Sequence, residues 1–207
     1  MVAYPLNQVA TMSETVSTAL LLIDIQASFT SRPYWSDAEV PAFLAACNTL
    51  IDGCTRQGVP IVQVFHTDGP DDSNNPFAVA SGLIRPLDGL HSYTPALSFH
   101  KHRHSALVGT GLADWLKGRG VTRLIVAGIR TEQCCETTTR HASDEGWDVD
   151  YVTEATLTFD MLTPAGTVLT AAAIKERTET VLTERFATLC TVPDALARAL
   201  ARAQAAA

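Results

Sequence analysis

The chain has 207 residues, 46% of them hydrophobic and 18% charged, and its 15 Lys and Arg against 22 Asp and Glu give a formal net charge of -7. That length supports one sizeable hydrophobic core, and the acidic balance argues against nucleic acid or an anionic membrane as the partner. No stretch resembles a membrane span or a signal peptide, and the five cysteines lack a zinc-like spacing. We therefore expect a cytoplasmic protein with free thiols that acts on a small molecule.

Residues 1–17 show no hydrophobic periodicity, which predicts an N-terminal arm ahead of a single domain over residues 18–207. The domain begins with a continuous apolar run at 19–23, typical of a strand covered on both faces, and the run ends in Asp24. A carboxylate at that position either caps the following turn or belongs to a ligand site, and the pattern favours neither.

A helix is predicted next, because Ser36 and Glu39 have capping-box spacing and an apolar stripe follows them as far as Cys54. Pro41 favours a start a few residues after Ser36, and Gly58 is expected to end the helix. The next strand, at 60–65, leads into His66. A histidine that is simply hydrogen-bonded at the strand end is favoured over one that lines a pocket.

Residues 69–95 are rich in Gly, Pro, Asn, Asp and Ser and predict a long binding loop. A short strand at 96–101 then ends in Lys101, and Thr110 is expected to open a helix that stops at Gly118 and Gly120. The remaining predicted elements are a strand at 124–128, a helix at about 134–145, a strand at 148–153, a loop at 154–166, a helix at 171–182, a strand at 186–190 and a final helix from 193.

This alternation of strands and helices predicts an α/β fold with three layers, α/β/α, around a mainly parallel, doubly wound (Rossmann-like) sheet. In such a sheet the carboxyl ends of the strands share one edge, so Asp24, Lys101 and Cys134 are expected to converge there. Cys134 falls in the first turn of a predicted helix, where the helix dipole and a nearby lysine would lower its pKa. These residue types provide a nucleophile, a base and a cation for covalent acyl transfer.

The chain resembles the cysteine hydrolases of the isochorismatase-like superfamily, which include nicotinamidases and N-carbamoyl amide hydrolases. The resemblance spans roughly residues 18–191 and rests on Leu-Ile-Asp-Ile-Gln at 22–26, Lys-His-Arg-His-Ser-Ala at 101–106, and Gly-Ile-Arg-Thr-x-x-Cys at 128–134. It implies a catalytic triad of Asp24, Lys101 and Cys134. It also implies a cis peptide between Ile129 and Arg130, with the backbone N–H groups of Arg130 and Cys134 forming the oxyanion site.

The activity implied is hydrolysis of a small amide, ureido or related substrate through a thioester, with no cofactor and no metal, in a homo-oligomer that is a dimer or a tetramer. We expect Phe29, His66 and His104 to line the substrate pocket, and the apolar residues at 159 and 161 to close it. Two departures from the family pattern matter. A second cysteine, Cys135, follows the nucleophile, and the Asp-x-His metal motif of nicotinamidases is absent between residues 24 and 66.

Two other functions are left open by the sequence. In the first, the same fold hydrolyses the vinyl ether of an isochorismate-like substrate, and Cys134 is a bystander. In the second, the protein is not catalytic and binds a small molecule or senses redox state through Cys134 and Cys135. The alternating histidines at 100, 102 and 104 have a spacing seen in zinc sites, but a buried or interface role is favoured for most of them.

Overall fold

The computed structural model describes residues 18–205, with side chains described as far as residue 200, so the predicted arm at 1–17 lies outside the described residues. Six parallel strands form one sheet in the order β3-β2-β1-β4-β5-β8. The strands are β1 (Thr18–Ile23), β2 (Ile61–His66), β3 (Leu97–Lys101), β4 (Arg123–Ile129), β5 (Asp148–Leu157) and β8 (Thr188–Leu189).

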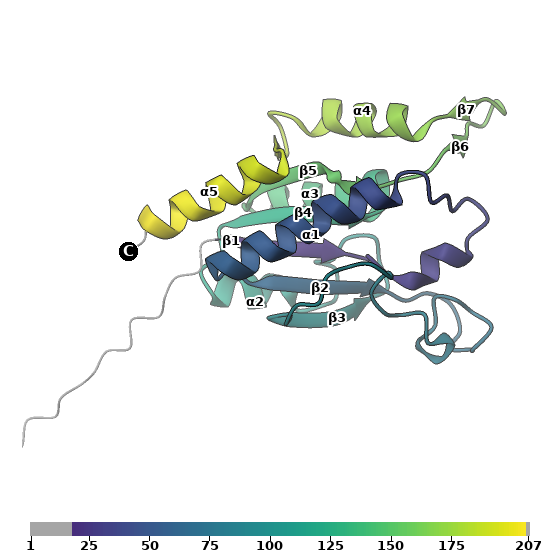
Figure 1. Ribbon diagram of the computed structural model, residues 1–207, viewed down its shortest axis with the longest axis horizontal. Helices are drawn as coiled ribbons and strands as arrows, with labels where there is room; N and C mark the ends of the chain where they lie inside the picture. The colour runs from purple at the N-terminus through teal and green to yellow at the C-terminus, as the bar shows by residue number, and fades with distance from the viewer. Residues whose placement is uncertain (1–17, 206–207) are drawn as a thin grey trace, which may run out of the picture.

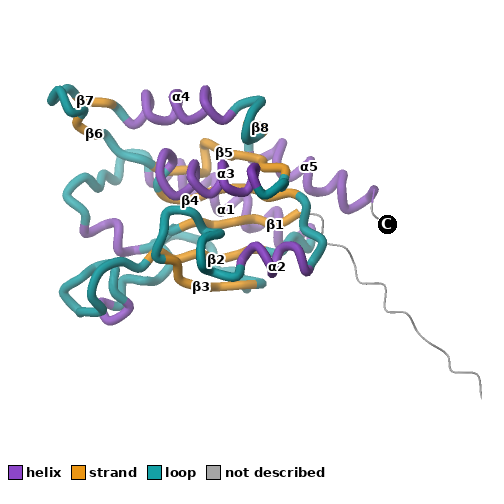
Figure 2. The backbone as a smooth tube through the Cα atoms, turned by 180° about the vertical axis from the view of Figure 1, so that it is seen from behind, coloured by secondary structure: helices purple, strands orange, loops and turns teal. Residues whose placement is uncertain are grey.

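Helices cover both faces of this sheet, as Figures 1 and 2 show from opposite sides. The layers are α1 (Val40–Gln57) and α5 (Val192–Ala205) on one face, and α2 (Leu112–Gly118) and α3 (Glu136–Asp144) on the other. Each face has its own apolar cluster, and every residue of β1 is buried because it lies between the two clusters. The predicted three-layer α/β/α architecture is confirmed.

The strand order reverses direction between β1 and β4, which are direct neighbours. Ligand crevices in open α/β sheets form at such a switch point, outside the carboxyl ends of the strands. Gly128 near the end of β4 has a φ of 145°, and a Cβ added there would lie 2.0 Å from the carbonyl oxygen of Ile23. Only glycine allows the two strands to approach this closely beside the crevice.

Several predicted element boundaries were wrong for local reasons. The capping box at Ser36 does not start the helix, because α1 begins at Val40 with Glu39 as its N-cap; the later start that Pro41 favoured is confirmed, with Pro41 in the first turn. Helix α2 begins at Leu112 after Gly111 rather than at Thr110, whose hydroxyl instead donates to the carbonyl of Ala106.

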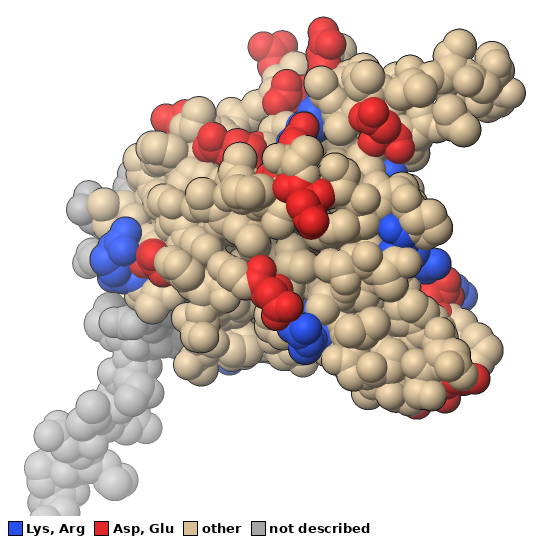
Figure 3. All heavy atoms as spheres, turned by 45° about the vertical axis from the view of Figure 1, so that its right-hand side comes forward, with Lys and Arg blue, Asp and Glu red and all other residues tan. Residues whose placement is uncertain are grey.

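The predicted loop at 154–166 is only partly a loop. Strand β5 continues to Leu157, and the chain then forms a separate antiparallel hairpin of β6 (Met161–Leu162) and β7 (Val168–Leu169) before α4 (Ala171–Leu182). The hairpin projects beyond the main body and has no charged residue between Asp160 and Lys175 (Figure 3).

The long connection at 69–95 contains only one short 3-10 turn, η2 (Val79–Ser81), as the sequence predicts. Across residues 18–205, none of the helices combines the length and apolar character that crossing a membrane requires.

Candidate active site

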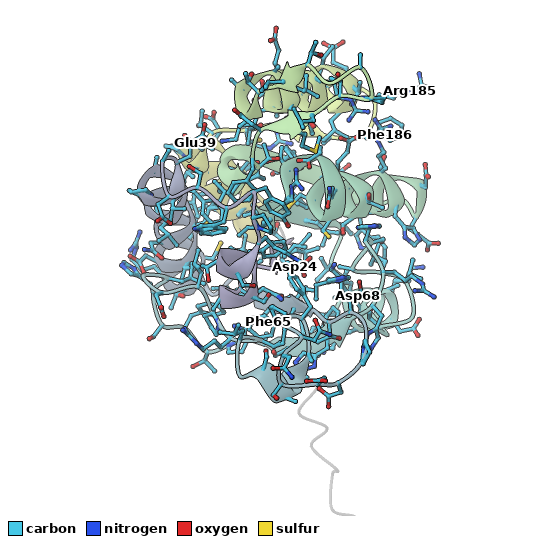
Figure 4. The ribbon with its side chains drawn as sticks, turned by 90° about the vertical axis from the view of Figure 1, so that its right-hand side faces the viewer. Asp24, Glu39, Phe65, Asp68, Arg185 and Phe186 are labelled. Carbon is cyan, nitrogen blue, oxygen red and sulfur yellow. The ribbon has the colours of Figure 1, made fainter. Side chains whose placement is uncertain are left out.

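Three polar side chains meet at the carboxyl edge of the sheet, although they come from different strands. The Lys101 ammonium lies 2.7 Å from Asp24 Oδ2 and donates to Cys134 Sγ at 3.3 Å. Asp24 and Lys101 are fully buried, and Cys134 is 5% exposed. Figure 4 faces this edge and shows Asp24 near the middle of the molecule, with Glu39 and Asp68 farther out. The predicted convergence of the three residues is therefore present.

The backbone explains why each group is there. Asp24 follows the last residue of β1 with a φ of 54°, a conformation that is rare for residues other than glycine and often found at functional sites. Lys101 is the last residue of β3. Cys134 lies in a π-helical turn, η3 (Thr131–Cys135), which follows β4 and leads directly into α3, so helical structure begins three residues earlier than predicted.

Burial and the attraction between their charges shift the pKa values of Asp24 and Lys101. Burial lowers the pKa of Lys101, but the negative charges of Asp24 and Cys134 outweigh it and hold the pKa above its ordinary value. The pKa of Asp24 is raised, because desolvation of its carboxylate outweighs the opposing effect of Lys101. Asp24 is therefore a stronger proton acceptor than an exposed carboxylate, beside a lysine that keeps its charge.

The prediction that Cys134 has a lowered pKa was wrong. Burial of the thiol is the largest effect, and the charge of Asp24 adds to it, so the pKa of Cys134 is raised to about 12 although Lys101 pulls it down. Cys134 is consequently a thiol with a proton acceptor beside it, rather than a preformed thiolate.

The second cysteine of the pair has different surroundings. Cys135 is fully buried in the apolar cluster on the α2–α3 face, where desolvation raises its pKa well above the ordinary value. The five cysteines are all unpaired in the structure, including these two adjacent ones. Packing in the core therefore accounts for the cysteine at position 135. Its side chain points about 100° around the helix from that of Cys134.

The peptide bond between Ile129 and Arg130 is cis, at the position implied by the family resemblance. The Arg130 side chain is nearly buried and forms an ion pair with Glu132 at 2.9 Å. Its guanidinium lies over the ring of Tyr34 at 4.8 Å and within 5.9 Å of the Phe159 ring centre. These contacts anchor the turn that precedes Cys134.

Of the three residues expected to line the pocket, two adjoin the Asp–Lys–Cys cluster and one packs against an aromatic ring. His104 Nδ1 lies 3.8 Å from Cys134 Sγ, and His66 Nδ1 lies 3.2 Å from the Lys101 ammonium. Both histidines thus adjoin the Asp–Lys–Cys cluster. Phe29 is buried in the 3-10 turn η1 (Ala27–Ser31), where it packs edge-on against Phe77 with ring centres 5.2 Å apart.

Sequence reasoning missed two residues that shape this site. Phe77, from the long loop, packs against His66 with ring centres 6.0 Å apart as well as against Phe29. Gln26 is fully buried, and its side-chain amide bonds to both the backbone N–H and the carbonyl of His66, at 2.7 and 2.9 Å. Gln26 was visible in the sequence as part of the motif after β1, but only the fold reveals its partner.

The alternating histidines separate because β3 ends at Lys101. His100 packs edge-on against Phe65, His102 bonds to Thr67, and His104 turns back to Cys134. Within the part of the chain that the structure describes, no group of three His, Cys, Asp or Glu side chains is arranged to hold a metal ion.

A cavity of about 390 Å³ lies beside the Tyr34 and Phe159 rings that Arg130 contacts, lined by apolar and polar residues of the β1–α1 connection and the segment after β5. Phe159 packs there against Tyr34 and Trp35, with ring centres 5.3 and 5.1 Å apart. The buried Asp–Lys–Cys cluster lies outside that lining.

The fold and site together define a doubly wound α/β protein with a buried Asp–Lys–Cys cluster at its switch point. The family model described as the Isochorismatase domain matches residues 18–192. The chain therefore belongs to the isochorismatase family of hydrolases.

Known proteins agree with this assignment. The chain is 25% identical over 178 residues to the isochorismatase family protein YrdC of Bacillus subtilis, covering 84% of this chain and 91% of that protein. It is 32% identical over 154 residues to Nicotinamidase 3 of Arabidopsis thaliana, covering 69% and 74%. Among solved structures, an isochorismatase from Pseudomonas putida superimposes with a TM-score of 0.74 at 26% identity, covering 86% and 90%.

Proposed function

We propose that this protein hydrolyses the C–N bond of a small amide, ureido or related substrate, with Asp24, Lys101 and Cys134 as its catalytic triad. The observation that carries the proposal is the buried ammonium of Lys101, which contacts both the carboxylate and the thiol. A thiol, a proton acceptor and a fixed cation in one water-poor site are the groups that covalent acyl transfer requires.

In the first step, Cys134 Sγ attacks the substrate carbonyl while Asp24 accepts the thiol proton. The raised pKa of Asp24 suits it to this role, since its carboxylate gains more from protonation than an exposed one. The developing oxyanion is held by the backbone N–H groups of Arg130 and Cys134, as the family resemblance implies. Lys101 compensates the charge that forms on sulfur.

In the second step, the tetrahedral intermediate collapses and the C–N bond breaks. Asp24 returns its proton to the leaving amine, so the base of the first step is the acid of the second. The acyl group remains on Cys134 as a thioester, which water then hydrolyses. The similarity to Nicotinamidase 3 supports amide chemistry, whereas the missing Asp-x-His motif favours a substrate other than nicotinamide.

A pair of matched variants tests the proposal. Cys134→Ala is expected to abolish ammonia release from a panel of small amides and ureides. Cys135→Ala, one residue away and packed in the core, is expected to retain turnover on the substrate that the panel identifies. If Cys134→Ala retained full turnover, the thioester mechanism would be wrong and the vinyl-ether reaction would be favoured. If neither variant nor native protein turned over any member, a binding or redox-sensing role would gain support.

The molecule is further proposed to act in the cytoplasm as a homo-oligomer, either a dimer or a tetramer. Five unpaired thiols suit a reducing compartment. Leu162 and Val168 on the uncharged β6–β7 hairpin are 73% and 61% exposed, which suits contact with a second copy. Sedimentation velocity measures the oligomeric state, and a monomer at all concentrations would refute this assembly.

A further inference from the structure

His104 is an exposed neighbour of the nucleophile, in contrast to the buried pair. Its Nδ1 lies 3.8 Å from Cys134 Sγ, and the residue is exposed in the loop that follows β3. Asp24 and Lys101, in contrast, are fully buried behind the sulfur. The sulfur therefore has a dry side, where the carboxylate and the ammonium lie, and a side open to water, where the imidazole lies.

On the buried side, the ammonium is already occupied by protein acceptors. The Lys101 ammonium already contacts Asp24, Cys134, the carbonyl oxygen of Arg103 at 3.1 Å and the Nδ1 atom of His66. Its three protons are thus shared among protein acceptors. Asp24 faces that ammonium and the thiol. A water that attacks an acyl group on Cys134 has easier access from the side of His104.

The imidazole of His104 stacks beside the ring of His66. His66 lies parallel to it, with an interplanar angle of 8° and ring centres 6.5 Å apart. Burial, followed by the charge of Lys101, lowers the pKa of His66 to about 4, so His66 is neutral near pH 7 and accepts from Lys101. His104 thus contacts the Cys134 thiol, stacks on a neutral His66 and interacts electrostatically with the Asp24 carboxylate.

We propose that His104 is a fourth catalytic residue, which accepts the proton of the water that hydrolyses the thioester. The water oxygen bonds to the acyl carbon as its proton passes to the imidazole of His104. The C–S bond then breaks, and the sulfur leaves as a thiolate that recovers this proton from the imidazolium. The net reaction is thioester plus water to carboxylic acid plus thiol. The inference rests on the proposed function, because it requires an acyl group on Cys134.

The experiment uses 4-nitrophenyl acetate, which acylates reactive cysteines whatever their natural substrate. Native protein is expected to release a stoichiometric burst of nitrophenolate, followed by a slower steady rate set by deacylation. In His104→Gln the burst should remain, whereas the steady rate should fall by about a hundredfold, the usual contribution of a general base. Peptide mapping by mass spectrometry should then find an acetyl group accumulating on Cys134.

His100→Gln is the matched control, because His100 belongs to the same strand and loop region but packs against Phe65. It is expected to deacylate like native protein. The pH profile separates catalysis from packing. The pH dependence of deacylation should change in His104→Gln and stay native in His100→Gln.

Two results would overturn the assignment of His104. One is an unchanged steady rate in His104→Gln. The other is an equal loss of burst rate and steady rate with the native pH profile retained, which indicates a structural role. A native protein whose Cys134 is never acetylated would instead contradict the proposed thioester mechanism itself, so the two failures are distinguishable.

Discussion

The Asp24 carboxylate has opposite effects on the charged forms of its two neighbours, because it favours the Lys101 ammonium and disfavours the Cys134 thiolate. This carboxylate is fully buried, follows β1 with a positive φ, and pairs with Lys101, whose ammonium also contacts Cys134. The carboxylate stabilises the lysine charge, yet it raises the pKa of the thiol that it must deprotonate. In the proposed mechanism Asp24 therefore acts by receiving the proton rather than by making Cys134 more acidic.

Asp24→Asn separates these two effects. Without the carboxylate, Lys101 remains as the dominant charge near Cys134, so the pKa of the thiol should fall below its value of about 12. Iodoacetamide alkylation of Cys134, followed across pH by peptide mapping, should reach its midpoint at lower pH. Amide turnover should nevertheless fall by about a hundredfold to ten-thousandfold, because the base is lost. Retained turnover together with the lowered pKa would contradict the role of Asp24 as base.

At the scale of elements, the contact between β1 and β4 positions the site. Asp24 follows one strand and the turn with Cys134 follows the other, so any separation of the two strands moves the base away from the nucleophile. Gly128 sets this separation, because its backbone contacts the backbone of Ile23.

Gly128→Ala is expected to lower the free energy of unfolding by about 3 kcal/mol or more, since the new Cβ overlaps a carbonyl that cannot rotate away and φ is positive. Gly118→Ala serves as the control. Gly118 ends α2, and a Cβ added there would meet no other atom within 4 Å, so its replacement should change stability by less than about 1 kcal/mol, on the stabilising side. Urea denaturation measures both, and a neutral Gly128→Ala would show that the strands can move apart freely.

At the scale of the whole molecule, ion pairs other than Asp24–Lys101 join the outer helices to the rest of the domain. Asp150, fully buried in the amino-terminal half of β5, binds Arg123 of β4 and Arg198 of α5. The site lies at the opposite, carboxyl ends of the strands. Glu136 similarly joins α3 to α4 through Arg177 and Thr178. The contacts of Asp150 thus attach α5 to the sheet, and those of Glu136 attach α4 to α3, two residues beyond Cys134.

Asp150→Asn should therefore destabilise the protein but leave its chemistry intact. Removing the carboxylate charge takes away the anion that Arg198 binds and leaves Arg123 with Asp148 alone, at a cost of about 1–3 kcal/mol, reduced by the partial exposure of Arg198. Urea denaturation measures the loss, and hydrogen exchange should show it concentrated in α5. The turnover of the folded variant should match that of the native protein. A large loss of turnover at unchanged stability would indicate coupling between the two edges of the sheet.

Local sequence patterns predicted most of the elements, because buried strands such as β1 need continuous apolar runs and α1 needs an apolar stripe. They failed where a competing local interaction decided the outcome. Thr110 bonds to the carbonyl of Ala106 instead of opening α2, and the chain at 161–169 forms a hairpin instead of a loop. The pKa of Cys134 was misjudged because a helix start and a lysine are visible in the sequence, whereas burial is not.

The sequence by itself determined the α/β/α class and the strands that carry Asp24, Lys101 and Cys134, because periodicity and strand ends are local properties of the chain. Only the tertiary structure decided how these groups interact. It buried the carboxylate and the ammonium together, raised the pKa of the thiol, and brought His66 beside Lys101 and His104 beside Cys134. Distances and desolvation depend on residues far apart in the chain, and no local pattern records them.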